Sequence, residues 1–402
     1  MAPTLTRCGD AAYSFFHYKE PRPISIEEMK ILASFPQNFI FFGNYKDIKD
    51  RIGNAVPPNF MKIIVKNIVK EVLMKSDFNV ISTFSGCGGS SLGYKMVGGK
   101  ILLAVEFNDN AVKTYKINFP DTPIYHGDIH DLSVKQCKEL ADIKTGELDI
   151  LDGSPPCQGF SMAGKRIMDD PRNSLFQEYI RLLRGLKPKV FVMENVSGMV
   201  KGKMKLVFAE IMKKLKNSGY QVKCRLMNAK YYNVPQSRKR LIFIGVRNDL
   251  NIKPSHPKPQ SKPITVKKAI GDLKGNTREE RFLPDILKKI AKLQPDKWST
   301  DIDIYKKIKG NTGGAISLKW MGWNKICGTL PKSEISLTGI VHPERERYIS
   351  LMEAKRISSF PDDFKFMGGR SKGIKRMGNS VPPNLMKAIA EHIKDNILLK
   401  IN

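Results

Sequence analysis

The chain of 402 residues carries a net charge of +29, and 41% of its residues are hydrophobic. This apolar content excludes a disordered chain, no apolar run is long enough for a membrane span, and the first residues lack the layout of a signal peptide. The basic excess favours nucleic acid as a partner, with solvated lysine-rich surfaces as the alternative. The six cysteines show no CxxC spacing, so we expect a reduced, cytoplasmic, DNA-associated protein without a metal site.

A repeated segment occurs near the two ends of the chain. Residues 24–64 match residues 349–389 without a gap. In each copy we expect a helix that stops before Ser-Phe-Pro, then a loop, and then a second helix that starts at Val-Pro-Pro. The copies are far apart in the sequence, so they indicate a duplicated segment rather than a solenoid. The expected helices are Ile26–Ala33, Leu351–Ser358, Met61–Leu73 and Met386–Leu398.

The middle of the chain alternates between short β-branched runs and helical patterns. This alternation predicts an α/β domain with a mostly parallel sheet, whose ligands bind beyond the carboxyl ends of the strands. Helices are expected at Phe176–Leu186 and Lys205–Lys216. The expected strands are Phe78–Phe84, Lys100–Val105, Leu148–Leu151, Val190–Met193 and Leu241–Gly245.

A glycine-rich turn, FSGCGGSSLG, follows the first strand and opens a helix. Its glycines let the backbone approach a ligand. Glu106 ends the next strand and suits a ribose diol, Phe107 can stack on an adenine, and Asp128 can accept from an adenine amino group. These features favour an S-adenosylmethionine site. An NAD site is the alternative, although Ser91 replaces the third glycine of the GxGxxG pattern.

A second motif, DGSPPCQGFS, follows the strand Leu148–Leu151. Two prolines stiffen the approach to Cys157, which places its thiol like a nucleophile; a buried, inert cysteine is the alternative. The other five cysteines are expected to be structural, with Cys87 as the one open case because it lies in the glycine-rich turn. Glu194 follows a buried strand and is either a general acid or a helix cap. The basic sequence QSRKR, with Arg238 and Arg240, either binds phosphate or a carbonyl oxygen or forms a solvated turn.

The order of these motifs resembles the DNA cytosine-5 methyltransferase family from about Asn79 to Asn402. The matching motifs are FSGCGGSSLG, Glu106, GSPPCQGFS, ENV, QSRKR and GNSVPPNL. The resemblance implies a Rossmann-like, S-adenosylmethionine-dependent methyltransferase fold with a small, irregular target-recognition domain. It also implies methyl transfer to carbon 5 of a cytosine that is flipped out of a short specific duplex site.

The same resemblance implies the roles of individual residues. Cys157 adds to carbon 6 of cytosine, and Glu194 contacts N3 and the exocyclic amine. Arg238 contacts the cytosine carbonyl, and Arg240 helps to position the site. Phe160–Arg172 is the loop that closes over the flipped base. The implied cofactor-binding residues are Phe84, Gly86, Gly88, Glu106, Phe107, Asp128, Ile129, Leu175, Asn379 and Ser380.

The chain is expected to divide into four parts. The C-terminal copy of the repeat has Ser380 where the N-terminal copy has Ala55, and we expect it to complete the cofactor pocket. The N-terminal copy lacks a Pro-Pro-Cys motif, so it is expected to be an added domain or a dimerisation element. The parts are the duplicated terminal-motif segment 1–76 (a remnant of a second methyltransferase), the catalytic and cofactor-binding domain 77–247, the target-recognition region 248–330, and the returning terminal segment 331–402.

Two other functions compete with this prediction. One is an RNA cytosine methyltransferase of related sequence, whose tyrosine-and-glycine signature is not found. The other is an inactive nucleic-acid-binding protein, against which intact Cys157, Glu194 and Arg238 argue. The expected partner is double-stranded DNA, together with a cognate restriction endonuclease of a restriction-modification system, and the protein is expected to be a monomer without membrane contact.

Overall fold

The computed structural model covers the chain in several stretches, which are residues 16–64, 78–156, 171–200, 202, 204–273, 281–293, 319–331 and 339–401. Cys157, most of the expected loop 160–172, parts of the expected recognition region, and residues 65–77 lie outside this description. The chain divides into two compact units, Met1–Asp77 and Phe78–Asn402. The first is called the N-terminal unit below, and each unit is described by itself.

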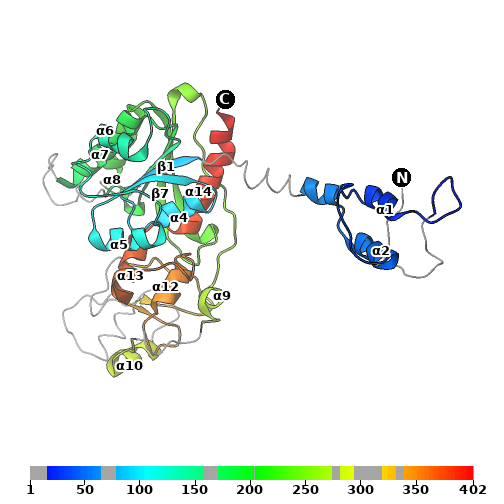
Figure 1. Ribbon diagram of the computed structural model, residues 1–402. Helices are drawn as coiled ribbons and strands as arrows, with labels where there is room; N and C mark the ends of the chain where they lie inside the picture. Colours follow the sequence, from blue (N-terminus) through cyan, green and yellow to red (C-terminus); the bar gives the residue numbers. More distant parts are fainter. Residues whose placement is uncertain are drawn as a thin grey trace. The chain divides into compact units, whose positions relative to one another are not determined.

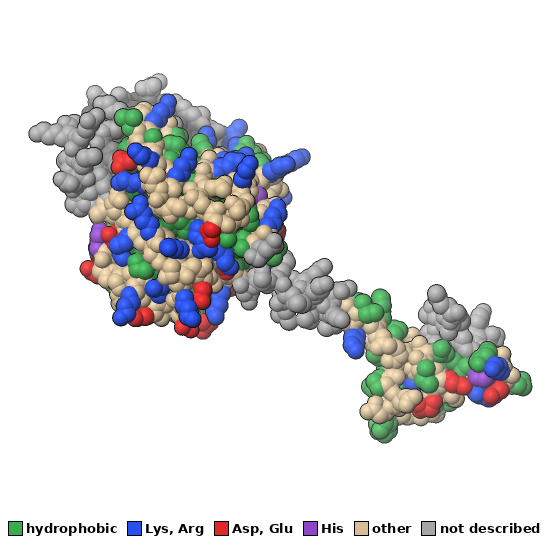
Figure 2. Space-filling model, turned by 90° about the horizontal axis from the view of Figure 1, so that it is seen from above, with side chains coloured by type: hydrophobic (Ala, Val, Ile, Leu, Met, Phe, Trp, Pro, Cys, Tyr) green, Lys and Arg blue, Asp and Glu red, His purple; other side chains and the backbone are tan. Residues whose placement is uncertain are grey.

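The N-terminal unit encloses a small apolar core and leaves many apolar side chains on its surface (Figure 2). Helix α1 (Ile26–Leu32) begins with a capping box between Ser25 and Glu28. Helix α2 (Tyr45–Asn54) follows, and residues 58–64 are helical. The core consists of Ile24, Met29, Ala33, Ile48 and Ile52.

The prediction of a loop between the two expected helices of each repeat copy is wrong for both copies. Helix α2 occupies this place in the N-terminal copy, and helix α13 (Gly369–Asn379) occupies it in the C-terminal copy. In the first copy, Ile48 and Ile52 lie one turn apart on α2 and both enter the core. The Gly-Asn pair before Val-Pro-Pro therefore forms the end of a helix in each copy.

The second unit contains a central seven-stranded sheet with the order β3-β2-β1-β4-β5-β7-β6 (Figure 1). Strand β7 is antiparallel to both of its neighbours, and the other described pairs are parallel. This confirms the expected α/β class with a mostly parallel sheet. The strands are β1 (Asn79–Thr83), β2 (Lys100–Glu106), β3 (Ile124–His126), β4 (Ile150–Gly153), β5 (Val190–Val196), β6 (Tyr220–Asn228) and β7 (Lys239–Arg247).

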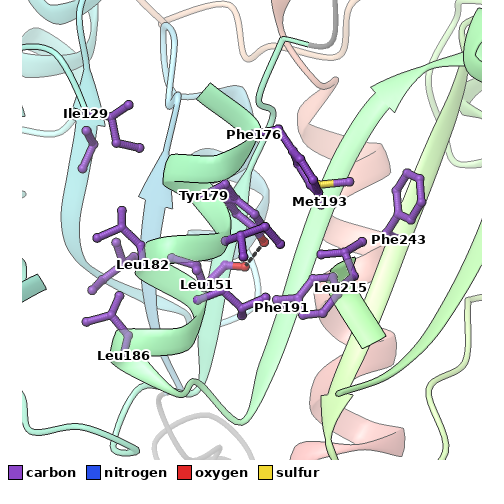
Figure 3. Packing of buried hydrophobic residues seen from close by; sticks show 14 of the residues in the cluster. Ile129, Leu151, Phe176, Tyr179, Leu182, Leu186, Phe191, Met193, Leu215 and Phe243 are labelled. Carbon is purple, nitrogen blue, oxygen red and sulfur yellow. Dashed lines mark hydrogen bonds between the residues drawn. The ribbon is translucent and has the colours of Figure 1, made fainter. Parts of the chain in front are cut away.

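Helices cover both faces of this sheet. On one face, α14 (Pro383–Asn396) packs with α4 (Gly89–Lys95) over strand residues such as Val80 and Ile242. On the other face, α6 (Val134–Ala141), α7 (Pro171–Leu186) and α8 (Met204–Lys216) pack against the alternate strand residues, such as Ile81 and Phe243 (Figure 3). Successive strand residues point to opposite faces, so a sheet buried on both sides needs continuous apolar strands. The remaining described α-helices are α5 (Asp109–Asn118), α9 (Val266–Ile270), α10 (Asp285–Leu293) and α12 (Leu351–Ile357).

All five strands expected from the sequence are present, but β3 and β6 were not among them. Strand β3 has only three residues, which is too short for a periodic pattern. Strand β6 is an edge strand in which Lys223 and Arg225 are exposed, so it lacks the continuous apolar run of a central strand.

The described part of the expected recognition region has a small core of its own. The two-residue strands β8 (Lys319–Trp320) and β9 (Ile340–Val341) pair in parallel. They pack with α10 in a buried cluster. This cluster includes Val341 and Tyr348, which lie beyond the expected end of the recognition region at residue 330. The cluster consists of Leu283, Leu287, Ile290, Ala291, Trp320, Val341 and Tyr348.

Candidate active site

A pocket of about 310 Å³ lies at the carboxyl ends of β1, β2 and β3. These strands are parallel neighbours, so the residues that follow them meet at one edge of the sheet. The structure therefore brings together six of the residues that the sequence implied for the cofactor. The lining residues are Phe84, Val105, Glu106, Phe107, Gly127, Asp128, Ile129, Pro156 and Leu175.

The turn after β1 fixes the carboxylate of Glu106. Gly86, at a φ of 58°, donates its N–H to Oε2 of Glu106 over 2.8 Å. The N–H of Asn108 donates to Oε1 over the same distance. A carboxylate has about four lone-pair sites, so each oxygen can still accept a hydroxyl proton from a ligand. The two backbone N–H groups thus orient the carboxylate of Glu106 and leave lone pairs on both of its oxygens for a ligand.

Asp128 is hydrogen-bonded to a histidine that was not predicted as a site residue. The backbone N–H of His130 lies 3.0 Å from Oδ1 of Asp128, and Nδ1 of its ring lies 2.6 Å from the same oxygen. The backbone hydrogen bond, supported by the ring, lowers the pKa of Asp128. Nε2 of His130 lies 2.8 Å from Oγ of Ser174, in the first turn of α7. The pocket acid is therefore connected to the helix that carries Leu175.

The C-terminal repeat copy packs directly against the glycine-rich turn. A methyl group added to Gly89 would lie 1.9 Å from Oγ of Ser380, and one added to Gly93 would lie 2.6 Å from Cβ of Met386. These contacts explain why small residues are needed at both positions. Asn379 ends α13 and is exposed.

The cysteine of this turn is not placed for chemistry. Cys87 is buried, its Sγ lies 3.9 Å from the carbonyl oxygen of Arg376, and burial raises its thiol pKa to about 12. Burial likewise raises the pKa values of Cys137 and Cys224 to about 12. A thiol in this range is almost entirely protonated at neutral pH and is a poor nucleophile.

The chemistry of the pocket fits S-adenosylmethionine. Glu106 offers an oriented acceptor for a ribose diol, and Asp128 offers a second acceptor for an amino group. Phe84, Ile129 and Leu175 supply apolar surface for a purine ring. The exposed ring of Phe107 lies at the margin of the same pocket.

The approach to Cys157 is anchored on the sheet. Pro156, the residue before Cys157, lines the pocket, and the carbonyl oxygen of Pro155 accepts a hydrogen bond of 3.2 Å from Nδ2 of Asn195. Asp152, the residue before the end of the buried strand β4, accepts hydrogen bonds from the hydroxyls of Ser82 (3.1 Å) and Tyr94 (3.2 Å). The cysteine itself lies outside the described residues.

Glu194 and Arg240 form an ion pair at the ends of β5 and β7. Nε of Arg240 lies 2.6 Å from Oε1 of Glu194, and both side chains are nearly buried. The antiparallel register pairs Val196 with Arg240, which brings the carboxylate and the guanidinium to the same end of the sheet. Asn195, next to Glu194, is the residue that holds Pro155. The acid is therefore fixed beside the segment that leads to Cys157.

Arg238 lies in a different environment from Arg240. Its side chain is 1% exposed, and Nη2 donates to the carbonyl oxygen of Gly378 over 2.8 Å. Burial lowers its pKa, with a further lowering by Arg240. Nε and Nη1 have no hydrogen-bond partner within the described part of the chain. The family resemblance implied that Arg238 contacts the cytosine carbonyl and that Arg240 helps to position the site. In the structure, Arg240 lies beside Glu194.

Three residues of this site were not predicted from the sequence. Asn195 and Asp152 lie inside the motifs ENV and DGSPPCQGFS, and His130 lies two residues after Asp128, but no pattern showed which atoms they contact. A signal was available for Asp152, because a carboxylate inside an apolar strand requires hydrogen-bond partners. The partners of the other two come from distant segments and become visible only in the fold.

Among the described residues, no helix has the length and apolar character needed to cross a membrane. Within the same residues, no group of three potential metal ligands is found.

The chain matches a family model described as C-5 cytosine-specific DNA methylase over residues 2–70 and 78–395. It is 35% identical to the Type II methyltransferase M1.HphI of Haemophilus parahaemolyticus, over 78% of this chain and 86% of that protein. It is 32% identical to the Type II methyltransferase M.XorII of Xanthomonas oryzae pv. oryzae, over 78% of this chain and 84% of that protein.

Solved structures with the same architecture extend this similarity. A prophage-encoded E. coli protein, described as a DNA modification methyltransferase, superimposes with a TM-score of 0.66 at 25% identity over 80% of this chain and 99% of that chain. The methyltransferase EhMeth of Entamoeba histolytica superimposes with a TM-score of 0.60 at 21% identity over 80% of this chain and 99% of that chain, and its likeness concerns the fold alone.

Proposed function

Because the chain belongs to the C-5 cytosine-specific DNA methylase family, we propose that it methylates a flipped-out cytosine through a covalent bond to Cys157. The chain is a DNA cytosine-5 methyltransferase with S-adenosylmethionine as methyl donor. The observation that carries the covalent mechanism is the position of the segment before Cys157. Pro156 lines the pocket proposed for the methyl donor, and Asn195 ties Pro155 to the strand of Glu194.

Cys157 is the proposed nucleophile. Carbon 5 of cytosine is a weak nucleophile, and addition of a thiolate to carbon 6 converts the ring into an enamine that is nucleophilic at carbon 5. The bond between Sγ and carbon 6 forms first and breaks last, when a base removes the proton from carbon 5. S-adenosylmethionine, when bound, supplies a methyl group that is activated by a sulfonium.

Glu194 is the proposed partner of N3 and the exocyclic amine of the cytosine. As the thiolate adds to carbon 6, negative charge develops on the ring, and a proton held at N3 neutralises it. We propose that Arg240, at 2.6 Å from Glu194, orients this acid and contacts the cytosine carbonyl.

Arg238 is the proposed positioning residue of the pair. Its buried guanidinium holds the carbonyl oxygen of Gly378 and thereby fixes the end of α13 against the catalytic sheet. This reverses the roles that the motif order alone implied for the two arginines.

Glu106, Asp128, Leu175 and their neighbours are the proposed cofactor-binding residues, with Asn379 and Ser380 at the adjoining end of α13. The duplex is proposed to lie between this edge of the sheet and residues 248–330. Lys and Arg side chains are spread over the visible face of the second unit (Figure 2), in keeping with the net charge of +29.

The biological setting is proposed from the relatives. Two of them, at 35% and 32% identity, are named Type II methyltransferases. We therefore propose that this enzyme protects a short DNA site in a restriction-modification system with a cognate endonuclease.

A trapping experiment tests the covalent mechanism. Bisulfite sequencing of DNA from an expressing host first identifies the methylated site. A duplex with 5-fluorocytosine at that site should then form a complex with the protein that survives denaturing electrophoresis, because fluorine at carbon 5 blocks the final elimination. The complex should require S-adenosylmethionine.

Two cysteine variants make this result specific. Cys157→Ala should give neither complex nor methylation. Cys224→Ala should behave like the wild type, since this thiol lies on an edge strand and its pKa is raised. Methylation by Cys157→Ala at the wild-type rate would refute the mechanism.

A further inference from the structure

The N-terminal unit reproduces the C-terminal repeat copy in its hydrogen bonds. Arg22 forms a bidentate pair with Glu28 (3.0 and 3.0 Å), and Arg347 forms the same pair with Glu353 (3.0 and 2.9 Å). In both copies the glutamate also closes a capping box on the first helix. The pairs stand at equivalent positions of the repeat, so the two segments share side-chain geometry as well as sequence.

The turn after the first helix is also shared. Ser34 and Ser359 have left-handed backbones with φ of 59° and 60°. Each hydroxyl accepts a backbone N–H at the start of the helix that follows Val-Pro-Pro (residues 58–64 in the first copy, α14 in the second). The donors are Asn59 over 3.0 Å and Asn384 over 3.2 Å. Three phenylalanine rings cluster beside each turn, with centroids about 5 Å apart. The described part of the N-terminal unit, up to residue 64, thus has the same local geometry as the C-terminal copy.

In the C-terminal copy, helix α14 is covered by the catalytic domain. Leu385, Met386 and Ile389 of α14 are completely buried against α4 and the sheet. Without α14, the apolar residues of this sheet face, such as Val80 and Ile244, would lose their cover. A catalytic domain of this kind therefore needs a terminal segment.

The equivalent residues of the N-terminal unit are exposed. Phe60 is 58% exposed where Leu385 is fully buried, and Ile63 is 59% exposed where Ala388 is 1% exposed. We call Val56, Phe60, Met61 and Ile63 the docking face. Four large apolar residues exposed within eight positions are unusual for a stable surface.

We propose that the docking face binds the catalytic domain of a second, separate cytosine methyltransferase chain that lacks its own terminal segment. We choose this partner because of the C-terminal copy, in which the equivalent residues of α14 cover one face of the sheet and pack against α4. A second copy of this chain is not the partner, because its α14 already fills that place. The N-terminal unit would thus supply the terminal segment of a second catalytic domain.

The contacts of the C-terminal copy indicate two glycines that the partner should have. In this chain, Oγ of Ser380 leaves no room for a side chain on Gly89. The N-terminal unit has Ala55 at the position of Ser380, but the backbone oxygen of Val381 would also lie only 2.4 Å from a side chain on Gly89, and Val56 keeps this valine, so the partner's counterpart of Gly89 should remain glycine. Met61 keeps the methionine of Met386, so the counterpart of Gly93 should remain glycine.

The test uses two differently tagged full-length chains produced in one host. The acceptor carries Leu385→Asp and Ile389→Asp, which prevent packing of its own α14, and Phe60→Asp and Ile63→Asp, which remove its own docking face. The donor carries only Cys157→Ala. Purification through both tags, without DNA or S-adenosylmethionine, measures the complex independently of the proposed chemistry. Methylation by the mixture is the second readout, since only the acceptor retains the nucleophile.

We expect a one-to-one complex that falls at least tenfold when the donor also carries Phe60→Asp. Absence of a complex with a soluble acceptor would overturn the proposal. If the aspartates leave no soluble acceptor, Leu385→Ala with Ile389→Ala loosens α14 instead. Excess donor should then raise the melting temperature of that acceptor, and an unchanged melting temperature would also overturn the proposal. A wild-type dimer abolished by Phe60→Asp would show that a second copy is the partner, which contradicts our choice.

Discussion

The two repeat copies form the same internal contacts in different surroundings. The C-terminal copy is covered by the catalytic sheet and contributes Ser380 beside the glycine-rich turn, whereas the N-terminal copy leaves its equivalent face exposed. The pair between Arg347 and Glu353 is buried, but the pair between Arg22 and Glu28 is partly open to solvent. Local sequence therefore determines the fold of this motif, and its partner determines what the motif contributes to function and stability.

The largest expected contrast comes from an aspartate introduced at equivalent positions of α14 and of the helical residues 58–64. Leu385→Asp buries a carboxylate between α14 and the sheet, which should abolish methylation and leave little folded protein. Phe60→Asp changes an exposed position and should alter stability by no more than about 0.5 kcal/mol. Thermal unfolding and a methylation assay measure both effects. Equal losses in the two variants would show that the N-terminal unit is part of the catalytic fold.

The glutamates of the capping boxes give the next contrast. Glu353→Gln removes the charge that pairs with buried Arg347 and lies 3.4 Å from His342, and should cost about 3–5 kcal/mol. Glu28→Gln breaks a solvent-accessible pair, so its effect on the melting temperature should be close to the error of measurement. A large effect at Glu28 would mean that the N-terminal unit is shielded in solution.

Acid should affect the two copies at different pH values. Burial lowers the pKa of His342 below its usual 6.5, so the unfolded chain binds more protons and stability falls as the pH drops below about 6.5. In the N-terminal copy, the hydrogen bond from Arg22 lowers the pKa of Glu28 from 4.5 to about 2, so that contribution is lost only between these values. Hydrogen exchange at pH 7, 5.5 and 4 should show residues 339–396 loosening before residues 16–64. The opposite order would contradict the buried placement of His342.

The smallest contrast is expected at the serine beside the glycine-rich turn. Ser380→Ala removes a hydroxyl at the proposed cofactor pocket and should weaken S-adenosylmethionine binding by about 1 kcal/mol, or roughly fivefold. Ala55→Ser, the reciprocal change, should leave binding unaltered. Isothermal titration calorimetry distinguishes the two outcomes, and a loss on Ala55→Ser would assign the pocket to the other copy.

Much of the catalytic domain could be predicted because its signals are local. Continuous apolar runs marked the central strands, and turns with unusual composition marked their carboxyl ends. Parallel pairing then brings Glu106 and Asp128 to one pocket without further information. The family resemblance was confirmed by the match to the C-5 cytosine-specific DNA methylase model.

The remainder depended on contacts between distant segments. Helices α2 and α13 have weak local signals because each contains glycine and many charged residues, and their apolar residues are recognisable only against a core. The environments of Arg238 and Arg240 differ because Gly378 approaches one and Glu194 the other. Two residues apart in one motif, they could not be told apart by spacing.

Bisulfite sequencing of host DNA tests most directly the claim that the unit Phe78–Asn402 is the complete enzyme. The host should lack cytosine methylation and express either the full chain or the chain without residues 1–75. Both should convert the same short site to 5-methylcytosine, since the glycine-rich turn, Glu194 and Ser380 all belong to this unit. Loss of methylation on deletion, with the protein still folded, would contradict the account and assign catalysis to the N-terminal copy.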